Sequence, residues 1–479
     1  MKRTLSIIIA ALMLLALAAA PAAAIEDNEW EKLKVTQLVQ VSTGINYADN
    51  EDLEYGKQTM RGFAVSPDGT RLFGGFLNPG NSSALVMFDT MTSRAIGYYV
   101  YYQPLDQKTS YPKGLDVDDR GYCYVGLAYY PNNGVANMAI LKYDEKDNQT
   151  GFLKEVSVTE LVHEADPGTG TKVGVNGLKV KAVGNGYYAY VVINYEVDYL
   201  YRFNVTNPET PVLDATFGEG GRMVLGADAF KIEGQAITEG NYLDVDDDGT
   251  IYLAATTESG QYLLKISDDG RSVLGYVAQR KAYGVAVWED KVICSSQNSP
   301  HEIIVYRSSN FEKVAQFTIA EENVVIPGGS SIDHISYDPI NSICTLKVAA
   351  GCLFFCDQGS GSGDCDQIFM AALNADGAAF EKTVSDSIEA TFKSLDTTEE
   401  ETTAAEPEPT TDEETTAGEP ETTTAAAEPE ATTAEEVKTP EVTTAAKEPE
   451  KKGCGSSVAG IALLIPVCAA VLTVKRKKD

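Results

Sequence analysis

Three aspartates in one short segment have the spacing of calcium ligands. The segment DVDDDG places Asp244, Asp246 and Asp248 at alternate positions before a glycine. Carboxylates at the first, third and fifth positions of a loop begin the oxygen cage of calcium-binding loops. The ligands that would close the cage are missing, because Tyr252 and Ala255 stand at the ninth and twelfth positions. The sequence leaves Ca²⁺ open as a ligand of this turn and predicts no other cofactor.

A second group of candidate binding residues lies in long connections between apolar segments. Tyrosine rings stack on sugars, and amide groups hydrogen-bond to hydroxyl and peptide groups, so the two together suit a glycan, peptide or protein partner. The candidates are Tyr101, Tyr102, Tyr111, Tyr129, Tyr130, Asn132, Asn133 and His301. The alternative is that individual tyrosines only cover the bases of their loops.

The rest of the composition argues against most kinds of catalyst. The chain has three histidines and contains no phosphate-binding glycine loop, nucleophile elbow or HExxH sequence. Its formal net charge of −32 disfavours nucleic acid, because phosphates would be repelled. A non-catalytic binding protein is favoured. The alternatives are a metal-dependent hydrolase or lyase acting at a central channel, and an architectural role in the envelope.

Six internal repeats position these residues. An apolar segment and an Asp- or Gly-containing turn recur as FAVSPDG, LDVDDRG, LKVKAVGNG, LDVDDDG, VAVWED and ISYDPIN. Each copy precedes three more β-rich segments, which in the sixth copy are SICTLKV, QIFMAALN and FEKTV. Val, Ile, Tyr and Phe between turn residues are typical of short antiparallel strands. The repeats predict an all-β, six-bladed β-propeller over residues 25–395, with a seventh blade left open.

The recurring units resemble NHL-type and YVTN-type propeller repeats. The resemblance rests on the D-x-D-G turn and the following IYLA-like strand, covers most of residues 60–385, and implies the fold without naming a ligand. The alternating segment KVTQLVQV, residues 34–41, is predicted to add the strand that closes the ring. Because strands alternate in direction, the long connections should share one face. These connections are residues 101–112, 128–138, 157–176, 218–240, 297–302 and 320–333.

The cysteines of the last repeat predict disulfides in preference to zinc. Cys344, Cys352, Cys356 and Cys365 match no CxxC metal spacing, and an exported protein favours oxidised pairs. Cys123 and Cys294 lie in second strands of opposite units and should not pair with each other, so buried thiols, or a bridge from Cys294 to Cys344, remain open.

The two ends of the chain predict export and anchoring. Basic residues, an apolar run and an Ala-x-Ala site predict a signal peptide over residues 1–24. Residues 396–452 are almost wholly Thr, Glu, Ala and Pro, which predicts a disordered acidic stalk. The uncharged residues 456–474 precede four basic residues, which predicts a transmembrane helix with a cytoplasmic tail.

Residues 453–479 resemble the tripartite C-terminal sorting signals of bacterial surface proteins. The Gly453-Cys454 start is most similar to the Synergist-type, Gly-Cys class. The resemblance implies a sorting protease that processes the chain near Cys454, whereas a plain stop-transfer anchor needs none. Both readings place an exported ectodomain at the cell surface, anchored to the cytoplasmic membrane.

Overall fold

The computed structural model describes one compact part of the chain. The described residues are 25–41, 59–77, 82–102, 110–129, 135–146, 153–163, 174–194, 198–297, 301–328, 340, 342–358 and 366–403. They belong to the first of two units, Met1–Pro407, and the second, Glu408–Asp479, lies outside them.

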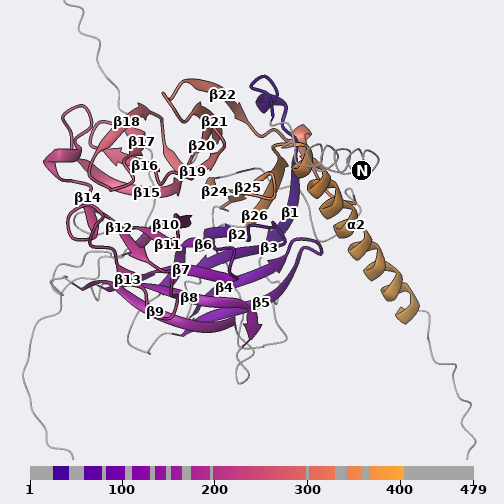
Figure 1. The fold of residues 1–479 in the computed structure, drawn as a ribbon. Helices are drawn as coiled ribbons and strands as arrows, with labels where there is room; N and C mark the ends of the chain where they lie inside the picture. Colours follow the sequence, from indigo (N-terminus) through magenta and orange to yellow (C-terminus); the bar gives the residue numbers. More distant parts are fainter. Residues whose placement is uncertain are drawn as a thin grey trace, which may run out of the picture. The chain divides into compact units, whose positions relative to one another are not determined.

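The described strands form six sheets around a common axis, antiparallel except for one short pair in the sixth, as Figure 1 shows. The first strands of successive sheets contact each other in a closed circle, in which the first strand of the sixth sheet contacts that of the first. This arrangement confirms the predicted all-β, six-bladed propeller.

The first three blades follow one another along the chain. Blade 1 contains β2 (Thr59–Val65), β3 (Arg71–Leu77), β4 (Ser82–Asp89) and β5 (Arg94–Tyr102). Blade 2 contains β6 (Ser110–Val117), β7 (Tyr122–Tyr129), β8 (Val135–Lys146) and β9 (Leu153–His163). Blade 3 contains β10 (Gly174–Val183), β11 (Gly186–Asn194) and β12 (Tyr199–Asn204), and its outer edge is shared by β13 (Val212–Leu213) and β14 (Arg222–Val224).

The next two blades are regular, and the sixth joins both ends of the propeller. Blade 4 contains β15 (Ile237–Val245), β16 (Ile251–Thr257), β17 (Gln261–Ile266) and β18 (Val273–Ala278). Blade 5 contains β19 (Ala282–Trp288), β20 (Lys291–Ser296), β21 (Glu302–Arg307) and β22 (Lys313–Thr318). Blade 6 contains β24 (Ile343–Ala349), β25 (Cys352–Asp357), β26 (Asp366–Ala372), β1 (Val35–Val41) and β23 (Val324–Val325).

The N-terminal strand closes the ring, as the alternating pattern of residues 34–41 predicts. β1 pairs antiparallel with β26, with Gln37 opposite Phe369, and pairs parallel with β23. Strand pairing between the two ends of the propeller holds the circle shut and leaves β24 at the axis.

The predicted strand order of the sixth unit is wrong by one strand. The segment SICTLKV supplies the first strand, β24, rather than the second. The segment FEKTV, expected as the outer strand, lies inside α2 (Ala375–Thr403). Phe380, Val384, Ile388 and Phe392 recur every fourth residue, and this face of the helix packs on the core between blades 6 and 1.

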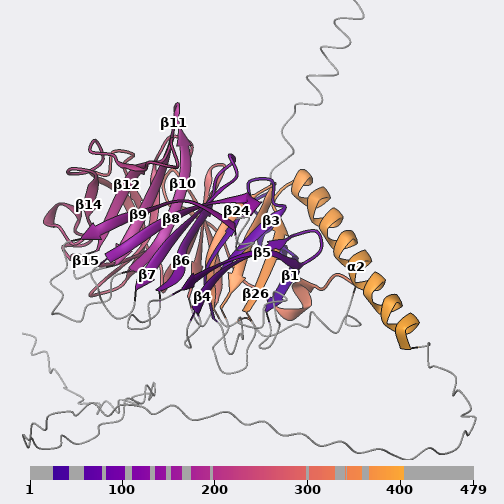
Figure 2. The same ribbon diagram turned by 90° about the horizontal axis from the view of Figure 1, so that it is seen from below.

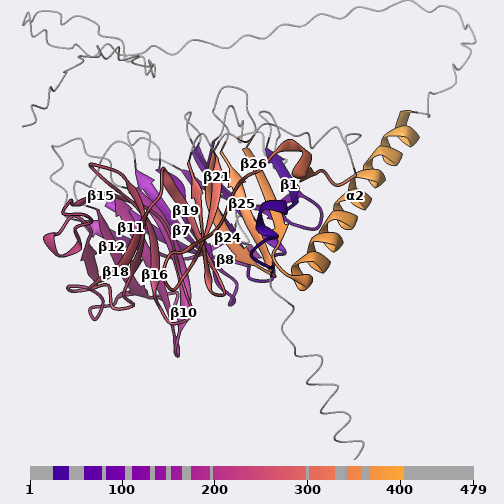
Figure 3. The same cartoon turned by 90° about the horizontal axis from the view of Figure 1, so that it is seen from above.

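Both faces of the inner strands are covered by neighbouring blades. Every residue of β20 and of β25 is buried, so neither strand shows the alternation of buried and exposed residues that marks a half-exposed strand. Figures 2 and 3 show the strands running between two faces of the ring, with α2 beside β26 and β1. Three short 3₁₀ helices, η1 (Trp30–Lys32), η2 (Asp228–Phe230) and η3 (Glu321–Asn323), complete the described elements.

Candidate functional site

The strand order assigns each connection to one of two faces. Turns between the first and second strands of the blades share what we call the first-turn face. Connections from second to third strands, and from one blade to the next, share the opposite face, which we call the long-loop face.

Four of the predicted binding tyrosines lie at strand ends on the long-loop face. Tyr101 and Tyr102 end β5, Tyr111 is near the start of β6, and Tyr129 ends β7. Blades 1 and 2 are neighbours, so the backbone brings these four positions to one sector of the face. The expectations for Tyr130, Asn132 and Asn133 lie outside the described residues.

His301 lies on the same face in blade 5, just before β21. Its backbone is left-handed, with a φ of 55°, and its Nδ1 is buried without a hydrogen-bond partner among the residues that the structure describes. Burial and the nearby Lys281 hold the pKa of the imidazole below its usual value. His301 is therefore neutral at pH 7.

Parts of the predicted long connections are strands instead of loops. Residues 157–163 belong to β9, residues 174–176 begin β10, and β14 and β23 lie within the segments expected to form rim loops. Loops of the predicted length would leave many backbone groups unpaired, and strand pairing at the blade edges removes that cost.

Four charged side chains occupy equivalent positions in four of the first strands. Each first strand has a Val at the same position of the repeat. The residue before this Val, in blades 1 to 6 in order, is Ala64, Asp116, Lys179, Asp244, Ala286 and Lys347. We call Asp116, Lys179, Asp244 and Lys347 the paired charge layer.

Each charge in this layer has an opposite charge beside it. Lys179 Nζ lies 3.0 Å from Asp244 Oδ1 and 3.7 Å from Asp116 Oδ2. Lys347 Nζ donates to Asp116 Oδ1 at 2.8 Å and lies 3.5 Å from the carbonyl oxygen of Leu178, in the opposite blade. Lys347 in blade 6 therefore reaches Asp116 in blade 2, and the equivalent residue of blade 1, which lies between them in the ring, is the small Ala64.

The two aspartates also complete the inner edges of the sheets. Asp116 Oδ2 accepts a hydrogen bond from the Val180 amide at 2.7 Å, and Asp244 Oδ2 accepts one from the Val287 amide at 2.8 Å. Each carboxylate thus bonds to the edge of the next blade, whose amide groups have no fifth strand to pair with.

Electrostatics keep Asp116 and Lys179 ionised. Burial alone would raise the pKa of Asp116, but Lys179 and Lys347 outweigh it and hold the pKa below its ordinary value. Burial opposes the proton on Lys179, but Asp116 and Asp244 raise its pKa. The groups neutralise one another, so the layer acts as a brace across the channel rather than as a source of free acids and bases.

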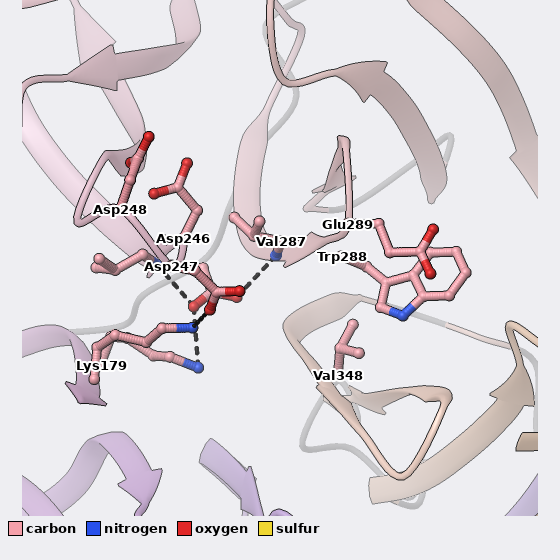
Figure 4. Close-up of a pocket in the computed structure, with 11 residues that line it drawn as sticks. Lys179, Asp246, Asp247, Asp248, Val287, Trp288, Glu289 and Val348 are labelled. Atoms are coloured by element: carbon pink, nitrogen blue, oxygen red, sulfur yellow. Dashed lines mark hydrogen bonds and ion pairs between the residues drawn. The ribbon is translucent and has the colours of Figure 1, made fainter. Parts of the chain in front are cut away.

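A pocket of about 430 Å³ opens beside this brace on the first-turn face, as Figure 4 shows. Its lining residues are Lys179, Lys181, Asp244, Val245, Asp246, Asp247, Asp248, Val287, Trp288, Glu289 and Val348. Burial, followed by the hydrogen bond and charge of Asp248, raises the pKa of Asp246 to about 7. Hydrogen bonds from Asp246 and Thr250 lower the pKa of Asp248 to about 2.

The three predicted calcium ligands all have partners within the chain, and the Thr250 amide donates to both Asp246 and Asp248. Asp244 is paired with Lys179 and with backbone amides, and Asp248 accepts hydrogen bonds from the Thr250 amide at 3.0 Å and hydroxyl at 2.6 Å. Within the described ranges, no group of three or more His, Cys, Asp or Glu side chains is placed to hold a metal ion. Calcium binding at this turn stays a prediction.

Each first strand carries a β-bulge between the paired charge layer and the long-loop face. The pairing register shifts at the same place in all six blades. The residues at these bulges are Arg61, Lys113, Asn176, Asn241, Tyr283 and Cys344, and we call them the bulge ring. A bulge re-aims the side chain of its extra residue and bends the strand.

Glycine follows the bulged residue in four blades because neighbouring first strands approach closely. A Cβ on Gly62 would lie 2.1 Å from the carbonyl oxygen of Lys113, and one on Gly177 would lie 2.5 Å from that of Asn241. The same position is Tyr242 in blade 4. Its hydroxyl donates to the carbonyl oxygen of Arg61, in the opposite blade, at 2.6 Å, so this side chain lies across the axis.

The bulge ring is polar and only partly paired. Lys113 Nζ donates to Asn176 Oδ1, and Asn176 Nδ2 donates to the carbonyl oxygen of Gly240 at 2.9 Å. Arg61 Nε and Asn241 Oδ1 are buried, and neither has a hydrogen-bond partner within the described part of the chain. The two layers of the channel therefore differ in how fully their polar groups are satisfied.

Both layers escaped the sequence analysis, although the repeats contain their signal. Aligned on the bulge, the first strands read RGFAV, KGLDV, NGLKV, NYLDV, YGVAV and CTLKV. The first column is the bulge ring and the fourth is the paired charge layer. The misassigned sixth unit hid both columns.

The disulfide prediction is wrong for three of the four cysteines in the last blade. Cys344, Cys352 and Cys356 are free and buried, as are Cys123 and Cys294. Burial raises the pKa of the Cys344 thiol to about 12, which keeps it protonated. Cys365 lies outside the described residues.

The predicted ends of the chain are largely outside the described residues. These include the signal peptide, the segment 456–474, and Gly453 with Cys454. Residues 396–403, expected to begin the stalk, are the last residues of α2. Among the helices described, none has the length and apolar character needed to cross a membrane.

The sheet order defines a six-bladed β-propeller, and the chain is similar to several solved structures. No protein-family model and no curated protein matches the chain, so the NHL-type and YVTN-type resemblance stays a prediction. BamB from Moraxella catarrhalis is 14% identical over 73% of this chain and 96% of its own, with a TM-score of 0.35. The Dos1 propeller is 14% identical over 68% and 82%, with a TM-score of 0.38. A protein of unknown function from Bacteroides caccae is 11% identical over 59% and 82%, with a TM-score of 0.35.

Proposed function

We propose that this chain is an exported bacterial surface protein whose propeller binds a partner without catalysis, through the long-loop face. The partner is a protein, a peptide or a glycan. The C-terminal segment 453–479 anchors the protein in the cytoplasmic membrane, with or without processing at Cys454, and residues 404–452 separate the propeller from the membrane.

The observation that carries this proposal is the placement of four tyrosines. Tyr101, Tyr102, Tyr111 and Tyr129 come from three strands of two neighbouring blades and lie at the same face. Aromatic residues gathered at one end of a rigid scaffold are typical of recognition surfaces, because they supply contact area at little cost in entropy.

The channel gives less support to the hydrolase or lyase alternative. Its inward carboxylates, Asp116 and Asp244, are ion-paired with lysines and hydrogen-bonded to backbone amides. A metal or a general base would have to displace those partners.

Glycan and peptide arrays probed with the purified chain test this proposal. The double variant Tyr101→Ala/Tyr129→Ala should weaken binding to any ligand found by about tenfold or more, as expected for aromatic anchors. Tyr276→Ala, which removes a tyrosine that is 42% exposed on the outer strand of blade 4, is the matched control and should bind as the wild type does. Arrays without a ligand, or equal loss in both variants, would refute recognition at this face. Labelling of intact cells with a membrane-impermeant reagent tests export separately.

A further inference from the structure

Two cations of the bulge ring form no ion pair among the residues that the structure describes. Arg61 and Lys113 lie in the first strands of neighbouring blades. The Arg61 Nε is buried without a partner, and Lys113 donates to a neutral amide, that of Asn176. Glu239 and Asp198 act on Lys113 only from beyond ion-pair distance.

This pairing pattern is opposite to that of the neighbouring layer, where Lys179 and Lys347 each contact a carboxylate. Arg61 and Lys113 are partly buried, and removing a cation even partly from water without a counter-ion is unfavourable. Such costs are characteristic of functional sites, where a ligand supplies the missing partner. An anion would supply such a partner for Arg61 and Lys113.

A neutral acceptor faces the same axis from the other side. Asn241 is 4% exposed, and its Oδ1 has no hydrogen-bond partner within the described residues. The adjacent Tyr242 reaches the carbonyl oxygen of Arg61. Tyr242 therefore spans the axis between the strands that carry Asn241 and Arg61, and an aromatic ring beside charged and amide groups is typical of sites that hold a sugar.

We propose that the bulge ring recognises a sugar acid. Arg61 and Lys113 bind its carboxylate, and Asn241 Oδ1 accepts a hydrogen bond from a ring hydroxyl on the far side. The planar guanidinium matches the two carboxylate oxygens, and the charge-assisted bonds replace the missing ion pair. This inference rests on the proposed function, because it makes the long-loop face a glycan-binding face.

Lys113 adds a pH signature. Burial, reinforced by Arg61 and opposed by Glu239, Cys344 and Asp198, lowers the pKa of Lys113 to about 8. A bound carboxylate favours the protonated amine, so binding takes up a proton around this pH. Affinity should fall as the pH rises above about 8.

Calorimetric titration of the full chain in detergent micelles tests the site, with D-galacturonate and a short oligogalacturonate as probes. D-galactose and a peptide with a free C-terminus are the reference ligands. Arg61→Gln and Lys113→Met should each raise the Kd for galacturonate by about tenfold or more, and Lys113→Met should abolish the loss of affinity above pH 8. Arg280→Gln, an exposed arginine between β18 and β19 on the same face, should change nothing. Arg61→Lys replaces Arg61→Gln if the latter does not reach the wild-type melting temperature.

The outcomes separate this inference from the proposed function. Galacturonate binding that both variants retain, or binding of the peptide but not of the sugar acid, would overturn the inference. Either result is compatible with a ligand that depends on the rim tyrosines. Arrays on which the wild type finds no ligand would instead remove the proposed function itself.

Discussion

The two ends of the channel are built from the same six strands, yet they treat charge in opposite ways. In the paired charge layer, each charge contacts an opposite charge, and the aspartates also bond to the next blade. The bulge ring lies three residues earlier in each first strand. There, Arg61 and Lys113 form no ion pair with any described residue. The same strands can therefore hold the ring together through the paired charge layer and offer unpaired polar groups to a ligand at the bulge ring.

Removal of Asp116 should produce the largest effect. Asp116→Ala leaves Lys347 and Lys179 buried without their shared partner and removes the acceptor of the Val180 amide. We expect the free energy of unfolding to fall by about 3–5 kcal/mol, measured by urea denaturation.

Two further variants decide whether this loss comes from the charge layer. Asp247→Ala removes a fully exposed carboxylate that bonds to Lys181 and should leave stability unchanged. Asp116→Leu combined with Lys347→Met should be more stable than Asp116→Ala, because no unpaired charge remains at that pair. Equal stability of Asp116→Ala and the wild type would show that the layer is not a brace.

The bulges should produce the next largest effect. In Gly62→Ala, the new methyl group meets the carbonyl group of Lys113, which is backbone and cannot rotate away. We expect a loss of about 1–3 kcal/mol in unfolding free energy, with weakened sugar-acid binding because Arg61 is the neighbouring residue. Gly260→Ala, where a Cβ meets only ordinary contacts at 3.6 Å or more, serves as the control. A stable Gly62→Ala variant would mean that the bulge does not need glycine.

The fold could be predicted from the sequence further than the site could. Strand-rich repeats and the closing segment 34–41 depend on local periodicity, which a single chain displays directly. The helix at residues 375–403 was missed because FEKTV is too short to separate a strand from a helix. Only the longer series Phe380, Val384, Ile388 and Phe392 shows the fourfold period.

The channel layers needed information that no local pattern contains. Lys347 meets Asp116 across 231 positions of sequence, and Tyr242 meets Arg61 across 181. Their types and strand positions are readable from aligned repeats, but ion pairing depends on which blades face each other. The assignment of the rim tyrosines to the long-loop face, by contrast, needs strand direction alone.

The smallest expected effect is a pH dependence of stability that comes from Asp246. Asp246, in the pocket on the first-turn face, has its pKa raised to about 7 by burial and by Asp248, against about 3.9 in an unfolded chain. The folded state therefore binds this proton more tightly, so its contribution to stability is complete below about pH 4 and is lost as the pH rises to about 7. Partial exposure of the group keeps the change modest.

Asp246→Asn should remove this slope, so that wild type and variant diverge between about pH 4 and 7 and run parallel above it. Urea denaturation at a series of pH values measures the difference, with Asp247→Asn, whose side chain is fully exposed, as the control. Because Lys113 titrates near pH 8 at the other end, the two ends should respond in separate windows, the first in stability and the second in ligand affinity. Asp246→Asn could instead follow the wild-type curve of unfolding free energy against pH throughout. In that case Asp246 and Asp248 would not share a proton, and the two ends would differ only in ion pairing.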